Sequence, residues 1–188
     1  MSRNSHLRWP EMTGKMIAVV GPSGVGKDSV MSGLCLAKTD LSLVQRAITR
    51  APDHLGENHI SLSEKEFENA KTAGQFVLDW KAHGLSYGIP FNSISALHKG
   101  QDMLINLSRN VLEEAHAVFD NFVVINLSAS KDVLRQRLLA RGRESDAEIE
   151  KRIARSLPAL SSQLNVHSVN NDHTLDHTIN TIIEYLDR

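Results

Sequence analysis

The stretch "MIAVVGPSGVGKDSV", residues 16–30, decides the fold class of this chain. Its apolar start predicts a buried strand at 16–20, and the residues that follow predict a helix at 27–38. Between them, Gly21 to Asp28 match the phosphate-binding pattern G-x-x-x-x-G-K-[ST] at every position but the last. A strand before the pattern and a helix after it make the match specific. The alternative is a glycine-rich turn that binds no phosphate.

The loop predicts a nucleotide site by a physical route. Glycines let backbone N–H groups point inward, and the start of the helix adds its positive end. Lys27 is expected to reach the β- and γ-phosphates and to act in catalysis. The residues expected to bind the nucleotide here are Gly21, Pro22, Ser23, Gly24, Val25, Gly26, Lys27, Asp28 and Ser29.

Asp28 stands where the pattern has a hydroxyl that binds a metal ion. A carboxylate is a hard oxygen ligand of the kind Mg²⁺ accepts, so Asp28 is the expected metal ligand. Ser29 cannot replace it, because adjacent helical residues point about 100° apart. The alternative is that Asp28 only caps the helix, as aspartates often do.

Composition restricts the function further. The chain has 188 residues, 41% hydrophobic and 23% charged, which is typical of one soluble globular domain. A net charge of -1 gives no general attraction to nucleic acid. One cysteine, Cys35, excludes an internal disulfide and fits a reducing, cytoplasmic location. No apolar run is long enough to span a membrane.

Short apolar runs alternate with helical patterns along the chain. This order predicts a parallel sheet covered by helices on both faces, a three-layer α/β fold. We expect an extension at 1–15 and a single domain at 16–188. The expected further strands are 102–107 and 122–127, and the expected further helices are 108–119, 130–141 and 174–188.

Two segments depart from this alternation. Residues 50–90 hold more Gly, His, Asn and Ser. We expect them to be an insertion that builds one wall of a cleft and binds the acceptor, the molecule that receives a phosphoryl group from the nucleotide. Residues 141–152, "RGRESDAEIEKR", are expected to form a mobile, arginine-rich lid. Arg137 and Arg141 are i,i+4 and share a helix face. With Arg152 they are candidates to neutralise charge during phosphoryl transfer, the alternative being a solvated charged helix.

Seven blocks follow one another over roughly 16–187: "GPSGVGKDS" (21–29), "RAITR" (46–50), "GENHISLSEKEF" (56–67), "GLSYG" (84–88), "INLSR" (105–109), "LRQRLLARGRE" (134–144) and "VNND" (169–172). With these blocks the sequence resembles the guanylate kinase family, and within it the ribose 1,5-bisphosphate phosphokinases. The resemblance implies an ATP site in which Asn171, or its neighbour Asn170, lies beside the adenine.

Departures from true guanylate kinases concern base recognition. Arg46 replaces a serine, while Asp79 and Ser108 stand at the places of the two guanine-reading carboxylates. The pattern keeps phosphate contacts and loses guanine contacts, and Arg46 favours a further phosphate. The implied acceptor-binding residues are Arg46, Arg50, Glu57, His59, Asp79, Tyr87 and Ser108.

The resemblance implies that ATP and Mg²⁺ serve phosphorylation of ribose 1,5-bisphosphate, a phosphosugar, to 5-phosphoribosyl 1-diphosphate. A kinase of guanylate or another nucleoside monophosphate is the alternative. A catalytically inactive module that binds phosphorylated ligands is the third interpretation. Neither nucleic acid nor membrane is expected as a partner, and a homodimer is compatible with the sequence.

Overall fold

The main sheet of the protein has five strands, all parallel; the sequence predicts a parallel sheet and three of its strands, at 16–20, 102–107 and 122–127. The computed structural model describes residues 11–51, 59–142, 144–154 and 158–188. The strands lie in the order β2 (Ser42–Leu43), β7 (Met103–Asn106), β1 (Met16–Val20), β8 (Phe122–Ser128) and β9 (Val166–Asn170). Every neighbouring pair is parallel, and β1 is central. The predicted three-layer α/β fold is confirmed.

Helices cover both faces of this sheet. One core lies between the sheet and the helices α1 (Lys27–Ala37), α4 (Lys131–Arg141) and α6 (Leu175–Leu186). The other core lies between the sheet, α3 (Leu112–Val118) and a second sheet. Short 3₁₀ turns complete this side at η1 (Phe91–Ile94), η2 (Leu97–Lys99) and η3 (Arg109–Val111). The predicted helix at 108–119 therefore begins as a 3₁₀ turn.

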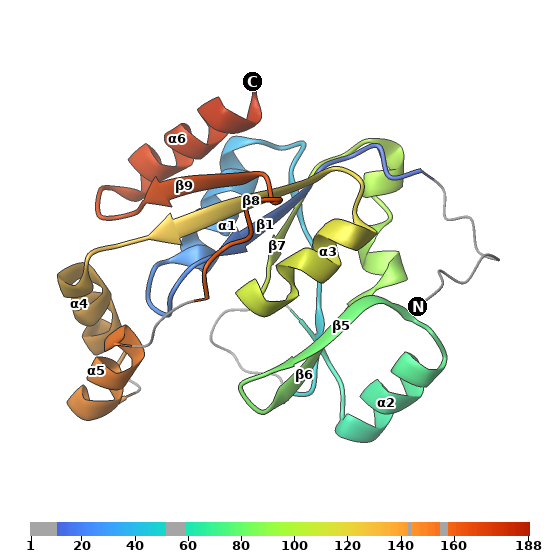
Figure 1. Ribbon diagram of the computed structural model, residues 1–188, viewed down its shortest axis with the longest axis horizontal. Helices are drawn as coiled ribbons and strands as arrows, with labels where there is room; N and C mark the ends of the chain where they lie inside the picture. Colours follow the sequence, from blue (N-terminus) through green and yellow to red (C-terminus); the bar gives the residue numbers. More distant parts are fainter. Residues whose placement is uncertain (1–10, 52–58, 143, 155–157) are drawn as a thin grey trace.

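A second sheet, here called the small sheet, takes three of its four strands from the segment 50–90 that the sequence predicts to be an insertion. Its order is β4 (Ile60–Ser61), β3 (Ala47–Ile48), β6 (Leu85–Pro90) and β5 (Phe76–Ala82). Helix α2 (Glu64–Thr72) covers its outer face and begins with a capping box of Ser63 and Glu66. The small sheet and α2 lie at the lower right of Figure 1.

The segment 141–152, expected to be a lid, contains most of a helix, α5 (Asp146–Ala154). It follows α4, which ends at Gly142 with a left-handed φ of 61°. In Figure 1 the pair α4 and α5 lies at the opposite end of the molecule from α2. The site must therefore lie between the lid and the small sheet, at the carboxyl ends of the parallel strands.

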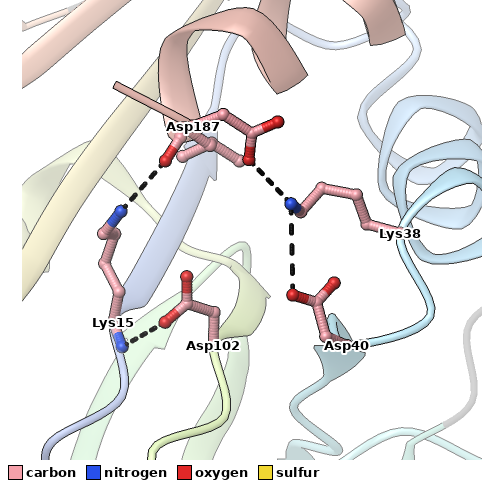
Figure 2. Close-up of polar contacts among 6 residues, drawn as sticks. Lys15, Lys38, Asp40, Asp102 and Asp187 are labelled. Carbon is pink, nitrogen blue, oxygen red and sulfur yellow. Dashed lines mark hydrogen bonds and ion pairs between the residues drawn. The ribbon is translucent and has the colours of Figure 1, made fainter.

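A charged cluster joins the other ends of the strands (Figure 2). The Lys38 ammonium pairs with Asp187 at 2.7 Å and lies 4.0 Å from Asp40. The Lys15 backbone N–H donates to Asp102, and its ammonium donates to the carbonyl of Leu186. This cluster fastens the ends of α1 and α6 to the starts of β1 and β7.

Residues 11–15 pack against the domain rather than extending ahead of it. Met12 packs against the core, and the Gly14 N–H donates to the carbonyl of Leu97 at 2.9 Å. A Cβ on Gly14 would lie 2.2 Å from the carbonyl oxygen of Gln101, so the backbone there is closely enclosed. Residues 1–10 of the expected extension lie outside the described residues. Within the described ranges, no helix combines the length and apolar character needed to cross a membrane.

Candidate active site

The phosphate loop is closely enclosed by side chains of α4 and of the segment after β9. It begins where β1 ends, and Gly26 precedes the first residue of α1 with φ 93°. A Cβ on Gly24 would lie 3.0 Å from the side chain of Leu138, and one on Gly26 would lie 3.0 Å from Asn171 Nδ2. Both glycines have positive φ, so side chains would strain the loop as well as crowd it. The loop has the tight cradle that a phosphate requires.

Lys27 lies over the mouth of this cradle. Its ammonium donates to the carbonyls of Gly21 at 3.0 Å and Pro22 at 3.1 Å. Burial lowers the pKa of Lys27, and the positive charges of Arg141, Arg46 and Arg109 lower it further, while Asp28 opposes the shift. Cations from three other segments therefore converge on Lys27, and an anionic ligand would relieve their repulsion.

Asp28 is exposed in the first turn of α1 and does not cap it. Gly26 is the N-cap residue, and no side chain makes a capping hydrogen bond to this helix. Among the described residues, no hydrogen bond or ion pair engages the Asp28 carboxylate. The capping interpretation therefore loses its geometric basis, and the carboxylate stays available beside Lys27.

The predicted arginines divide into a fixed group and a lid group. Arg137 donates to the carbonyl of Val25 at 3.2 Å and to that of Asn171 at 2.8 Å, which binds α4 to the loop. Arg152 reaches the loop from α5, with its Nη1 3.0 Å from the Ser23 hydroxyl and 2.7 Å from Glu144. Arg141 is exposed at the end of α4. Arg137 and Arg152 thus contact the loop, and Arg141 acts on it only through its charge, which lowers the pKa of Lys27.

Arg46 approaches the loop from the side opposite to the arginines of α4 and α5, next to the small sheet. It is buried, with an exposed fraction of 6%, and donates to the carbonyl of Asn106 at 2.6 Å. Its guanidinium lies 5.4 Å from the ring of Tyr87 and 6.0 Å from that of Trp80. These two rings stack on each other at 5.3 Å. The small sheet thus presents a positioned guanidinium toward the carboxyl end of β7.

The remaining acceptor candidates come from both sheets. Arg50 follows β3, and its carbonyl accepts the Ser61 hydroxyl and lies 3.4 Å from His59 Nε2. Ser108 follows β7 and accepts from the N–H of Asn110. Glu57 lies outside the described residues.

Comparison with known proteins identifies the family of this chain. The guanylate kinase family profile matches residues 13–188. The chain belongs to the guanylate kinase family.

Relatives of this family member are close over most of its length. A protein named ribose 1,5-bisphosphate phosphokinase PhnN, from a Ruegeria species, is 51% identical over 168 residues, which is 88% of each chain. A protein of the same name from Pseudomonas paraeruginosa is 38% identical and covers 93% of this chain and 96% of its own. A guanylate kinase structure from Anaplasma phagocytophilum superposes with a TM-score of 0.68 at 17% identity, covering 94% and 86% of the two chains. That structure supports the fold alone.

Asp79 is placed away from the other acceptor candidates of this family member. It follows Leu78 and precedes Trp80 on β5, and both of these pack in the core beneath the main sheet. Because side chains alternate along a strand, Asp79 faces the opposite side, where it pairs with Lys71 of α2 at 2.5 Å. The structure therefore does not support the expected contact between Asp79 and the acceptor.

Asn171 has a structural role that differs from the expected one. Its side chain is 3% exposed, donates to the carbonyl of Val25 at 2.7 Å and accepts from the Thr178 hydroxyl at 2.7 Å. Both ends of the amide are thus engaged, and the side chain holds the phosphate loop from behind. The expectation that Asn171 lies against the adenine finds no support in this geometry.

Arg109 and Thr178 are the residues that the sequence did not single out. Arg109 follows β7, the neighbour of β1, and a charged residue directly after such a strand was a usable signal. Thr178 gave no signal, because it resembles any small polar residue on a helix.

The site residues fit ATP and Mg²⁺. The loop supplies a glycine cradle at a helix start, Lys27 supplies a cation, and Asp28 supplies an unengaged carboxylate. Within the described part of the chain, no group of three or more His, Cys, Asp or Glu side chains could hold a metal by itself. A single carboxylate together with phosphate oxygens is the usual way to bind Mg²⁺.

Proposed function

We propose that this protein transfers the γ-phosphoryl group of ATP to the 1-phosphate of ribose 1,5-bisphosphate, giving ADP and 5-phosphoribosyl 1-diphosphate. The observation that carries the proposal is the buried Arg46, held by Asn106 and by the stacked rings of the small sheet. Relatives that carry the name of this activity align over nearly the whole chain. We place the protein in the cytoplasm, where its single cysteine stays reduced.

Arg46 favours a phosphosugar over guanine for electrostatic reasons. A buried guanidinium has lost hydration, and an anion with two or three acceptor oxygens restores its interactions better than a neutral base does. At the two places where guanylate kinases read guanine, this chain has Ser108 and an Asp79 engaged by Lys71. The site would therefore bind a phosphate at each end of the acceptor rather than a base at one end.

The chemistry requires positioning and charge neutralisation. An oxygen of the 1-phosphate forms a bond to the γ-phosphorus as the bond to the bridging oxygen of ADP breaks. That oxygen is already anionic at neutral pH, so no general base is needed. Lys27, Arg141 and Arg152 would hold the transferring group, and Arg137 would fix α4 against the loop. Mg²⁺ held by Asp28 would neutralise charge between the β- and γ-phosphates.

An acceptor screen tests the proposal. ADP release would be measured with ribose 1,5-bisphosphate, ribose 5-phosphate, GMP and AMP, each at several concentrations. We expect the bisphosphate to give the highest kcat/KM and GMP to be a poor acceptor. A preference for GMP would establish the nucleotide kinase alternative, and no ATP turnover with any acceptor would favour the inactive binding module.

Arg46→Ser provides the residue-level test. A charge-assisted hydrogen bond to phosphate contributes about 1.5–3 kcal/mol, so kcat/KM for the bisphosphate should fall roughly ten- to a hundredfold. GMP should not become a good acceptor, because Ser108 still supplies no carboxylate. Arg188→Ser is the control, since Arg188 is exposed after α6 and outside the candidate site. Equal losses in both variants would contradict the role of Arg46.

A further inference from the structure

Arg109 carries a positive charge that the proposed mechanism has not used. It begins η3 after β7, and its Nη2 donates to Asn126 Oδ1 at 2.7 Å. Its Nη1 donates to the carbonyl of Pro158 at 3.0 Å. Both partners are neutral oxygens. Among the described residues no carboxylate lies in ion-pair range of Arg109, and its buried Nε–H has no hydrogen-bond partner.

The position of Arg109 is set by the strand that leads into the phosphate loop. Asn126 of β8 pairs with Val20, the last residue of β1, and Asn106 of β7 pairs with Val19. Arg109 is anchored on Asn126, and Arg46 is anchored on Asn106. The two guanidinium groups are therefore fixed on the two strands that flank β1 at its carboxyl end.

The two anchors lie on the acceptor face of the sheet or at its edge. Val124 of β8 packs in the core shared with α3 and the small sheet, whereas Ile125 packs against α1 and α6. Because side chains alternate along β8, Asn126 faces the same side as Val124. Arg109 therefore approaches the loop from the side of the small sheet, and the lid arginines approach it from α4 and α5.

An anion bound near the end of β1 would reduce the repulsion among the cations gathered there. Arg109 and Arg46 both lower the pKa of Lys27, and burial lowers the pKa of Arg109 itself. A doubly charged phosphate at the end of β1 would accept from all three groups and remove this repulsion. Arg46, beside the stacked rings of Trp80 and Tyr87, lies next to the small sheet, whereas Arg109 is bound to Asn126 of β8.

We propose that Arg109 binds the phosphate of the acceptor whose oxygen attacks the γ-phosphoryl group, an inference that rests on the proposed function. Arg46 then binds the phosphate at the far end of the acceptor. In this arrangement Arg109 and Lys27 hold the two reacting groups on either side of the bond that forms. Arg109 would keep the like charges of the two phosphates from preventing their approach.

The experiment compares Arg109→Met and Arg109→Lys with the surface control Arg188→Met, at an exposed arginine after α6. The kcat/KM for ribose 1,5-bisphosphate is measured at saturating ATP, the KM for ATP is measured at saturating acceptor, and urea unfolding is followed in parallel. Arg109→Met should lower kcat/KM for the acceptor roughly ten- to a hundredfold and leave the KM for ATP close to the wild-type value. Arg109→Lys should show a smaller loss confined to the acceptor, because lysine keeps the charge but loses the forked geometry.

A purely structural role predicts a different result. It would lower the free energy of unfolding, through the lost bonds to Asn126 and Pro158, and leave kcat/KM for the acceptor unchanged in both variants. That outcome overturns the proposal, as does a rise in the KM for ATP alone. If Arg109→Met does not fold, the acceptor-specific loss in Arg109→Lys decides the question.

A second acceptor tests which phosphate is bound. Ribose 1-phosphate keeps the attacking phosphate and lacks the other one. If Arg109 binds the attacking phosphate, Arg109→Met lowers kcat/KM for both acceptors by the same factor, whereas a loss seen only with the bisphosphate overturns this assignment. Should the wild-type protein use another phosphate acceptor, the proposed function fails, and the same comparison on that acceptor still tests Arg109.

Discussion

The buried pair Asn171 and Thr178 predicts a measurable coupling of stability between β9 and α6. Asn171 is 3% exposed and Thr178 is 0% exposed, and the hydroxyl donates to the amide oxygen at 2.7 Å. Thr178→Val preserves the shape of the side chain but removes this donor. A buried acceptor left without a partner costs about 1–3 kcal/mol, so the free energy of unfolding should fall by that amount.

The reference variant is Asn171→Ala, which removes the amide group itself and so both of its hydrogen bonds. Two hydrogen bonds, to Val25 and from Thr178, are lost, which at about 0.5–1.5 kcal/mol each predicts a loss of roughly 1–3 kcal/mol before any cavity cost. In the Asn171→Ala background, Thr178→Val no longer leaves a buried acceptor without a hydrogen-bond partner. Its cost should therefore drop by about 1 kcal/mol, within the usual range of coupling between contacting residues.

Urea unfolding of the wild type, both single variants and the double variant, followed by circular dichroism, gives the coupling directly. Additive effects, agreeing within about 0.5 kcal/mol, would refute the hydrogen bond as a stabilising contact. The KM for ATP supplies a second readout. Thr178→Val should raise it less than Asn171→Ala does, because only Asn171 contacts the phosphate loop. If Asn171→Ala raised the KM for ATP without lowering the free energy of unfolding, the result would support a direct contact between Asn171 and the adenine.

Two further predictions concern the phosphate loop. Lys27→Ala should abolish phosphoryl transfer without unfolding the protein, because a buried ammonium with a lowered pKa adds little to the stability of the fold. Near-normal ADP release by this variant would contradict the assignment of residues 21–28 as a phosphate-binding loop. Asp28→Ala should weaken activity most at low Mg²⁺ and recover partly when Mg²⁺ is raised, and Asp28→Ser should be milder. An Asp28→Ala loss that does not depend on Mg²⁺, or a loss of only about 1 kcal/mol of stability, would instead indicate a structural residue at the helix start.

Local patterns predicted the main sheet well. The strand at 16–20 is found at Met16–Val20, and the helix expected at 130–141 is found at Lys131–Arg141. These elements combine continuous apolar burial or a capped helical period, both of which are visible within a dozen residues. β9 was not expected because it is an edge strand, with His167, Ser168 and Asn170 among its five residues.

The small sheet and the loop supports depended on distant partners. Strands β3 and β4 have two residues each, too few for any period to register. Asn171 and Val25 are separated by 146 positions, and Arg137 and Val25 by 112. A family motif could place these residues near the nucleotide, but only the folded chain shows that they contact the loop from behind. The burial of Arg46 likewise depends on Trp80 and Tyr87, which lie on the paired strands β5 and β6, far from Arg46 in the sequence.

The two bonds of Arg137 to backbone carbonyls have a consequence for motion. The bond to Val25 joins α4 to the phosphate loop, and the bond to Asn171 joins α4 to the residue after β9, so we expect this helix and the loop to move together. If the lid rotates, the rotation is expected in the chain after Arg141, where Gly142 has a left-handed backbone and open space around it, and it would break the ion pair between Arg135 of α4 and Glu150 of α5. Arg152 would travel with α5 through a wide arc, exchanging Ser23 and Glu144 for other partners, while Arg137 stays still. Opening and closing should therefore change the distance between these two arginines, and spectroscopic labels on α4 and α5 would record each cycle as a change in their separation.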